Sequence, residues 1–155
     1  MPPESPGSLK ARLKNDVNTA LRAGDKERLS VLRMAMAAIQ QREVDGRLTL
    51  ADDGVQAALE KMVKQRREAI EQFRSGGRED LAAKESAEIE VLKEYLPEPM
   101  GPEEAERLVE DVIHSLGASS PKDMGRVMAE IKSRAAGRVD LAQLSSLVRA
   151  RLSAA

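Results

Sequence analysis

The chain has 155 residues, of which 41% are hydrophobic and 33% charged, and its formal net charge is −1. This balance excludes an intrinsically disordered chain and allows one domain or two small ones. The absence of cysteine excludes a disulfide scaffold, a thiolate zinc site and a cysteine nucleophile. With one Phe, one Tyr and no Trp, the core must be aliphatic, which suits packing of helix on helix.

The first seven residues contain three Pro and one Gly and lack an apolar segment. They predict a disordered tail over residues 1–7 and not a signal peptide. No later stretch is apolar enough to span a bilayer, so we expect no membrane partner. Together with the lack of cysteine, this favours a cytoplasmic protein.

Helical periodicity of hydrophobic residues predicts four helices in the first two thirds of the chain. They are expected to begin near Ser8, Asp25, Thr49 and Arg78. Ser8 and Asp25 are suitable N-caps, and Thr49–Asp52 resembles a capping box. The third helix should end at Gly76 and Gly77, because glycine lowers helix propensity, and the fourth helix is strongly acidic.

The clearest break in the pattern is the segment of residues 97–102, which holds three Pro and one Gly. Proline removes a helical hydrogen bond and restricts the residue before it, so no helix continues here. We therefore predict an N-terminal unit over residues 8–96, a linker over 97–101 and a C-terminal domain over 102–155. The expected fold is all-α, with a four-helix N-terminal unit and a small three-helix C-terminal domain.

In the C-terminal domain, the first helix is expected to begin at Pro102 and end at Gly117. Ser120–Asp123 has the order of a helix start, with a serine cap, proline at the first position and aspartate at the third. A turn at Gly137–Asp140 should separate the last two helices. Gly125 is expected in the middle of an otherwise good helix, where a glycine costs about 1 kcal/mol against alanine. It indicates either a close helix crossing or the close approach of a partner's backbone.

The sequence contains no recognisable catalytic constellation. The single histidine, His114, has no partner for catalysis and is interpreted as a partly buried or surface imidazole. Glu85, Glu88 and Glu90 could suggest metal ligands, but the Glu-x-x-His pairs of helical di-metal sites are missing. We prefer a solvated acidic face, balanced by the bases of the preceding helix. We expect no catalytic residue, no cofactor and no metal.

Charge is strongly segregated along the chain. The net charge is +3 over residues 56–78, −9 over residues 79–111 and +4 over residues 122–151. Segregation of this kind favours a charged partner, or docking of one part of the chain on another. The main candidates for contact with a polyanion are Gly125 and seven C-terminal bases, Lys122, Arg126, Lys132, Arg134, Arg138, Arg149 and Arg151. A secondary basic face consists of Lys61, Lys64, Arg67, Arg74 and Arg78.

Two alternative interpretations remain for the bases of the third helix. The secondary basic face could be an ordinary solvated face that the acidic fourth helix balances. Arg66 lies within the apolar stripe of the third helix and could be a buried pair partner.

Because the C-terminal domain has no aromatic residue, base stacking is not expected there, and an RNA partner would be recognised through its backbone and shape.

Several short segments, in their order and spacing, resemble the GatB/YqeY domain family, specifically its free-standing YqeY-like proteins. In chain order they include Asp25–Leu29, Lys64–Phe73, Gly77–Ala82, Glu85–Ile89, Tyr95–Pro97, Asp123–Met128 and Gly137–Arg138. The resemblance covers nearly the whole chain after residue 7. One departure is Gly137–Leu141, where relatives tend to have Ala and then Gly after the Asp.

The resemblance implies a fold similar to the helical and tail regions of the B subunit of tRNA-dependent amidotransferase. It also implies a non-catalytic accessory that holds tRNA, with an aminoacyl-tRNA synthetase or amidotransferase subunits as further candidate partners. A helical protein-interaction module that never touches RNA is the alternative. The second alternative is an amidotransferase-type carbon–nitrogen ligase with glutamine as amido donor, as the family label implies, although no catalytic residues are visible.

Overall fold

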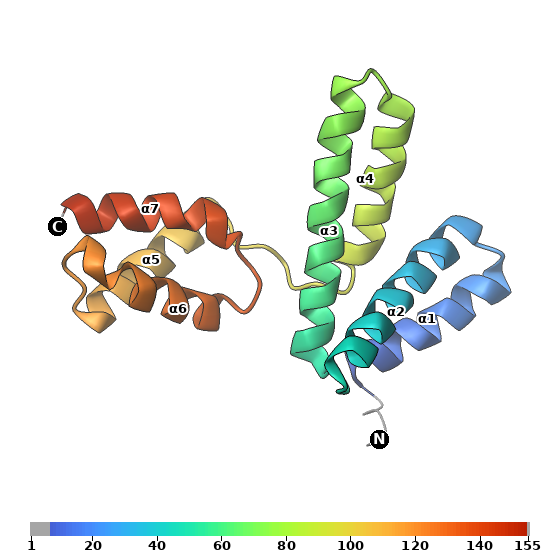
Figure 1. Cartoon of the computed structure of the whole chain (residues 1–155), viewed down its shortest axis with the longest axis horizontal. Coiled ribbons are helices and arrows are strands. Elements are labelled where there is room, and N and C mark those ends of the chain that lie inside the picture. Colours follow the sequence, from blue (N-terminus) through green and yellow to red (C-terminus); the bar gives the residue numbers. More distant parts are fainter. Residues whose placement is uncertain (1–6, 155) are drawn as a thin grey trace. The chain divides into compact units, whose positions relative to one another are not determined.

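The computed structural model describes residues 7–154, which form seven α-helices and one short 3₁₀ helix, with no strand among them (Figure 1). The all-α prediction is confirmed. The helices are α1 (Leu9–Ala23), α2 (Lys26–Gly46), α3 (Asp52–Ser75), α4 (Glu79–Lys93), α5 (Pro102–Leu116), η1 (Pro121–Asp123), α6 (Met124–Ala135) and α7 (Leu141–Ala154). None of these described helices is long and apolar enough to cross a membrane. Except for Gly7, the predicted disordered tail lies outside the described residues.

Side-chain caps set the starts of α1 and α2. The Ser8 side chain accepts a hydrogen bond from the N–H of Ala11, and Asp25 accepts one from Arg28, each at 3.1 Å. Both predicted caps are therefore confirmed. The predicted capping box at the start of α3 is wrong, because Ala51 occupies the cap and makes no side-chain bond. Asp52 instead accepts a hydrogen bond from the N–H of Leu9 at 2.9 Å, which ties α3 to the start of α1.

The residues up to Leu96 form one compact unit that contains α1–α4. Its helices pack as two hairpins, α1 with α2 and α3 with α4 (Figure 1). The core takes fully buried residues from every helix, among them Leu13, Leu32, Leu59 and Leu92. Tyr95, which follows α4, is 3% exposed and closes this core. A mainly aliphatic interior of this kind is what the near absence of aromatic residues requires.

The residues from Pro97 form a second compact unit that contains α5, η1, α6 and α7. Val109, Val112, Val127, Ile131 and Val148 are fully buried in its separate core. The capping box predicted at Ser120–Asp123 is present, and it starts η1, which runs directly into α6.

Candidate nucleic-acid interface

Two of the predicted C-terminal bases pair with acids of their own helical segment. The Arg126 guanidinium lies 3.0 Å from Asp123, and that of Arg134 lies 2.9 Å from Glu130. The N–H of Ser119 and then the Arg126 guanidinium hold the pKa of Asp123 below its usual range. Asp123 therefore remains a carboxylate, and it offsets part of the positive charge beside it.

Two further bases connect α5 to later parts of the same unit. Arg138 makes two hydrogen bonds to the carboxylate of Glu104, at 3.0 and 3.2 Å, and donates a third to the Glu98 carbonyl at 2.9 Å. Arg151 lies 2.5 Å from Glu110. A bidentate arginine–carboxylate pair fixes geometry strongly. Arg138 is therefore bound within the unit by contacts that hold its fold together.

The remaining three bases are exposed and free of such pairs. Within the described chain, no carboxylate lies within 4 Å of the ammonium or guanidinium groups of Lys122, Lys132 and Arg149. These side chains are available to a polyanion without the loss of an internal ion pair.

The helices do not direct the seven bases to one side. At 3.6 residues per turn, Lys132 and Arg134 lie about 160° apart around α6, and Arg149 and Arg151 lie about 160° apart around α7. The two bases on each helix therefore lie on opposite sides of that helix's buried stripe. Lys122, Gly125, Arg126 and Lys132, in contrast, are all exposed and share one side of η1 and α6.

Gly125 lies in the first turn of α6 and not in the middle of a helix. A methyl group added to it would meet no described atom within 4 Å outside its own turn of helix. The interpretation as a close helix crossing is therefore wrong. The other interpretation, close approach by a partner, stays a prediction.

The secondary basic face divides into two parts. Arg74 pairs with Glu79 at 3.2 Å and Arg78 with Asp80 at 3.0 Å, so these two arginines are balanced by the start of α4. Lys61, Lys64 and Arg67 are exposed on α3, and no described carboxylate lies within 4 Å of them. At a spacing of three residues they cover about a third of the circumference of α3.

Arg66 is the buried pair partner that its place in the apolar stripe of α3 suggested. Its Nε lies 3.0 Å from Glu88 Oε2 and 3.9 Å from Glu85 Oε2, and its side chain is 12% exposed. Burial, followed by the nearby charge of Glu88, raises the pKa of Glu85. A base of the preceding helix therefore balances the acidic helix, as predicted, but Glu85 and Glu88 are half-buried beside this arginine and not solvated.

One polar network of the N-terminal unit had no signal in the sequence. Tyr95 donates its hydroxyl hydrogen to Asp16, and Arg28 lies 2.5 Å from Glu94 and 3.3 Å from the Tyr95 hydroxyl. Burial and the bond to Asp16 raise the pKa of Tyr95. These bonds join α1, α2 and the end of α4 across 66 to 79 positions of sequence. No local pattern predicts contacts over such separations.

His114 and the three glutamates that were considered for chemistry belong to different units of the chain. His114 is exposed on α5. In the described part of the chain, no group of three or more His, Cys, Asp or Glu side chains could hold a metal ion.

Two aliphatic helical units, each with its own core, define an all-α protein. The chain matches the Yqey-like protein family over residues 10–152 and belongs to it. The family resemblance inferred from the motifs is therefore confirmed.

Curated relatives come from several fungi. The chain is 33% identical over 129 residues to "Altered inheritance of mitochondria protein 41, mitochondrial" of Pyrenophora tritici-repentis, covering 80% of this chain and 71% of that protein. It is 32% identical over 114 residues to the protein of the same name in Lachancea thermotolerans, covering 72% and 61%. An uncharacterized protein of Schizosaccharomyces pombe is 32% identical over 91 residues, or 59% of this chain and 74% of that protein.

The prediction of a cytoplasmic protein is contradicted by these relatives, because two of them are named as mitochondrial proteins. That prediction relied on the lack of cysteine and of apolar segments. Neither feature distinguishes the cytoplasm from the interior of an organelle.

Proposed function

We propose that this chain is a non-catalytic accessory that binds tRNA, and that the contact is made by one exposed face of η1 and α6. This α6 face consists of Lys122, Gly125, Arg126, Ala129, Lys132 and Ser133, all of them exposed. The family's resemblance to parts of a tRNA-dependent amidotransferase suggests tRNA as the polyanion.

The observation that carries this proposal is the open surface at Gly125. Gly125, Ala129 and Ser133 recur every four residues, so small side chains form a line along the helix. Lys122, Arg126 and Lys132 lie around this line. A phosphate backbone can approach such a strip closely, and each phosphate that a base neutralises adds to a salt-dependent affinity.

This proposal narrows the earlier set of candidates. Arg138 and Arg151 are assigned to ion pairs that connect different helical segments, Arg134 to a pair on the other side of α6, and Arg149 to a separate helix. On α3, the unpaired bases Lys61, Lys64 and Arg67 offer a second, weaker contact with the same RNA.

Filter binding of a tRNA transcript across a salt series tests the α6 face. The charge reversals Lys122→Glu and Lys132→Glu should each lower affinity and reduce the slope of log K against log salt by about 1. Arg149→Glu is the matched control, because Arg149 is equally exposed and unpaired but lies on α7. If Arg149→Glu weakens binding as much as the other two changes, or if duplex DNA binds as well as tRNA, the proposal is wrong.

Close approach at Gly125 has its own test. Gly125→Ala should stabilise the unit, because alanine is a better helix former than glycine and its methyl group meets no described atom outside its own turn of helix. The same change, and more strongly Ala129→Leu, should weaken tRNA binding by obstructing the approach. Ala150→Leu, on the exposed side of α7, is the control for added bulk. Unchanged affinity in Ala129→Leu would show that no partner lies against this strip.

A further inference from the structure

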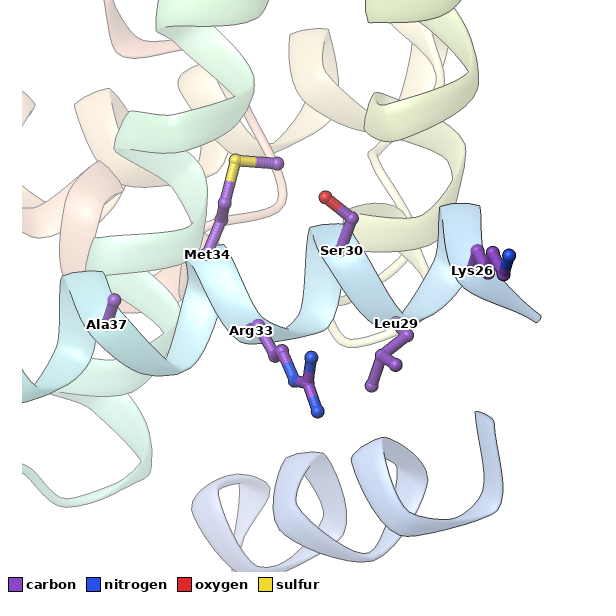
Figure 2. Close-up of a pocket in the computed structure, with 6 residues that line it drawn as sticks. All are labelled: Lys26, Leu29, Ser30, Arg33, Met34 and Ala37. Carbon is purple, nitrogen blue, oxygen red and sulfur yellow. The ribbon is translucent and has the colours of Figure 1, made fainter. Parts of the chain in front are cut away.

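A shallow hollow with a volume of about 460 Å³ lies on the outer side of α2. Figure 2 shows that its lining residues all come from this one helix. Its two largest apolar residues have partners within the unit, because Leu29 packs against the N-terminal core and the Met34 sulfur accepts a hydrogen bond from Arg66 at 3.6 Å. The hollow is therefore an open helix face. More specific contacts lie in the segment that joins the two units.

The N-terminal unit fixes this segment as far as Leu96. The N–H of Leu96 donates to the Lys93 carbonyl at 3.1 Å, and the Leu96 side chain packs against the N-terminal core. Tyr95, the residue before it, is buried, and the Arg12 guanidinium lies 4.6 Å from the centroid of its ring. The chain therefore leaves the N-terminal unit only after Leu96.

The C-terminal unit binds the chain again two residues later. Arg138 Nε donates to the Glu98 carbonyl at 2.9 Å, and the Arg138 carbonyl accepts the N–H of Met100 at 2.8 Å. The Met100 side chain packs against the C-terminal core. Arg138 therefore binds the connecting segment through its side chain and its backbone together.

Arg138 is itself held in place by its own unit. Its two terminal nitrogens donate to the carboxylate of Glu104, in the first turn of α5, at 3.0 and 3.2 Å. The Arg138 N–H donates to the Ala135 carbonyl at 3.0 Å. The two side chains of the ion pair are 35% and 50% exposed, so the pair adds little stability. Its bidentate geometry fixes the direction of the guanidinium, and Nε is thereby aimed at the Glu98 carbonyl.

Pro97 is the residue between these two points of attachment. Its ring fixes its own φ and restricts the backbone of the residue before it. Rotation is therefore confined mainly to ψ of Pro97 and φ of Glu98. Without the contacts of Arg138, residues 97–101 would rotate freely. Because the reach of a flexible segment grows with the square root of its length, five free residues in place of one increase it about twofold.

We propose that Arg138 is a positioning residue that fastens residues 98–100 to the C-terminal unit and leaves a hinge of one residue, Pro97, between the two units. This role replaces the contact with a polyanion that the sequence predicted for Arg138. The hinge limits the freedom of the α6 face relative to the bases of α3, since these surfaces belong to different units. The proposal needs no RNA, because the contacts of Arg138 all lie within its own unit.

Pulsed electron–electron double resonance on the full chain tests this hinge. The chain contains no cysteine, so spin labels attach only to those introduced by Ala83→Cys on α4 and Ala150→Cys on α7, both at exposed positions. Arg138→Ala should widen the distribution of distances between the labels about twofold. Arg134→Ala is the matched control, because Arg134 is a paired arginine of the same unit, and it should leave the width unchanged.

Hydrogen exchange measured by nuclear magnetic resonance gives a local readout of the same contacts. The Met100 amide should be protected in the wild type and exchange about tenfold faster in Arg138→Ala, while α5–α7 keep their protection. Should Arg138→Ala unfold these helices, Glu104→Gln replaces it, because that change loosens the guanidinium and should also widen the distribution. The proposal is overturned by an unchanged width in the folded variant, or by a wild-type Met100 amide that exchanges as fast as in an unfolded chain.

Discussion

Lys10 is the buried charged side chain of the N-terminal core, and Glu43 holds it there. The two side chains are 9% and 11% exposed and form a direct ion pair between α1 and α2. Glu43 also accepts the N–H of Leu50 at 2.7 Å, in the turn before α3. Removing one partner of such a pair leaves the other charge buried and uncompensated, which is far more costly than removing both.

We expect Lys10→Met to lower the free energy of unfolding by about 3–5 kcal/mol. The double variant Lys10→Met with Glu43→Gln should recover much of this loss, because the glutamine is neutral and its carbonyl still accepts the Leu50 N–H. Lys26→Met, at an exposed position, is the control. Urea unfolding followed by circular dichroism measures all three, and a double variant less stable than Lys10→Met would contradict this account.

The same pair predicts part of the acid sensitivity. Hydrogen bonds from Lys10 and then from the Leu50 N–H lower the pKa of Glu43. A lowered folded pKa gives stability that is complete above the unfolded pKa of about 4.3 and is lost as pH falls through the folded value. The stability difference between wild type and Glu43→Gln should therefore shrink below about pH 4.3.

The helix α6 ends in a strained backbone conformation. Ala136, its C-cap, has φ 48° and ψ 44°, in the left-handed region that favours glycine. The next residue, Gly137, also has a positive φ of 84°. The geometry of this turn places alanine where a glycine fits better.

Ala136→Gly should therefore raise the stability of the chain by about 0.5–1 kcal/mol. Ala129→Gly, within the same helix and exposed, should lower it by a similar amount, because glycine is a poor helix former. Thermal unfolding of the two variants gives opposite shifts of Tm. A loss of stability in Ala136→Gly would show that this turn does not strain alanine.

At the scale of the whole molecule, the chain has two hydrophobic cores that share no residue. Leu32 and Ile131 are fully buried, one in each core. Large-to-small changes at such sites cost about 2–5 kcal/mol through lost contacts and the cavity left behind.

We expect Leu32→Ala to increase hydrogen exchange in α1–α4 and to leave α5–α7 at wild-type protection. Ile131→Ala should do the reverse. Native-state hydrogen exchange, read by mass spectrometry on peptides from each unit, separates the two effects. If either change alters protection equally in both units, the chain unfolds as one cooperative body.

Most of the helical framework could be predicted because its signals are local. The caps at Ser8 and Asp25, the capping box at Ser120 and the apolar stripes each depend on residues within one or two turns of helix. The false capping box at Thr49 shows the limit of such signals. There the side chain of Asp52 bonds to Leu9, 43 positions away, instead of to its own helix.

Membership of the family could also be predicted from the sequence, because the motifs that identify it occur in a fixed order along the chain. Which bases are available to a partner was decided only by the tertiary structure. Arg138 and Arg151 pair with acids 34 and 41 positions earlier, whereas Lys122 and Lys132 have no such pair in the described chain. Sequence fixes the sign and number of charges, but the contacts that neutralise them join residues that only folding brings together.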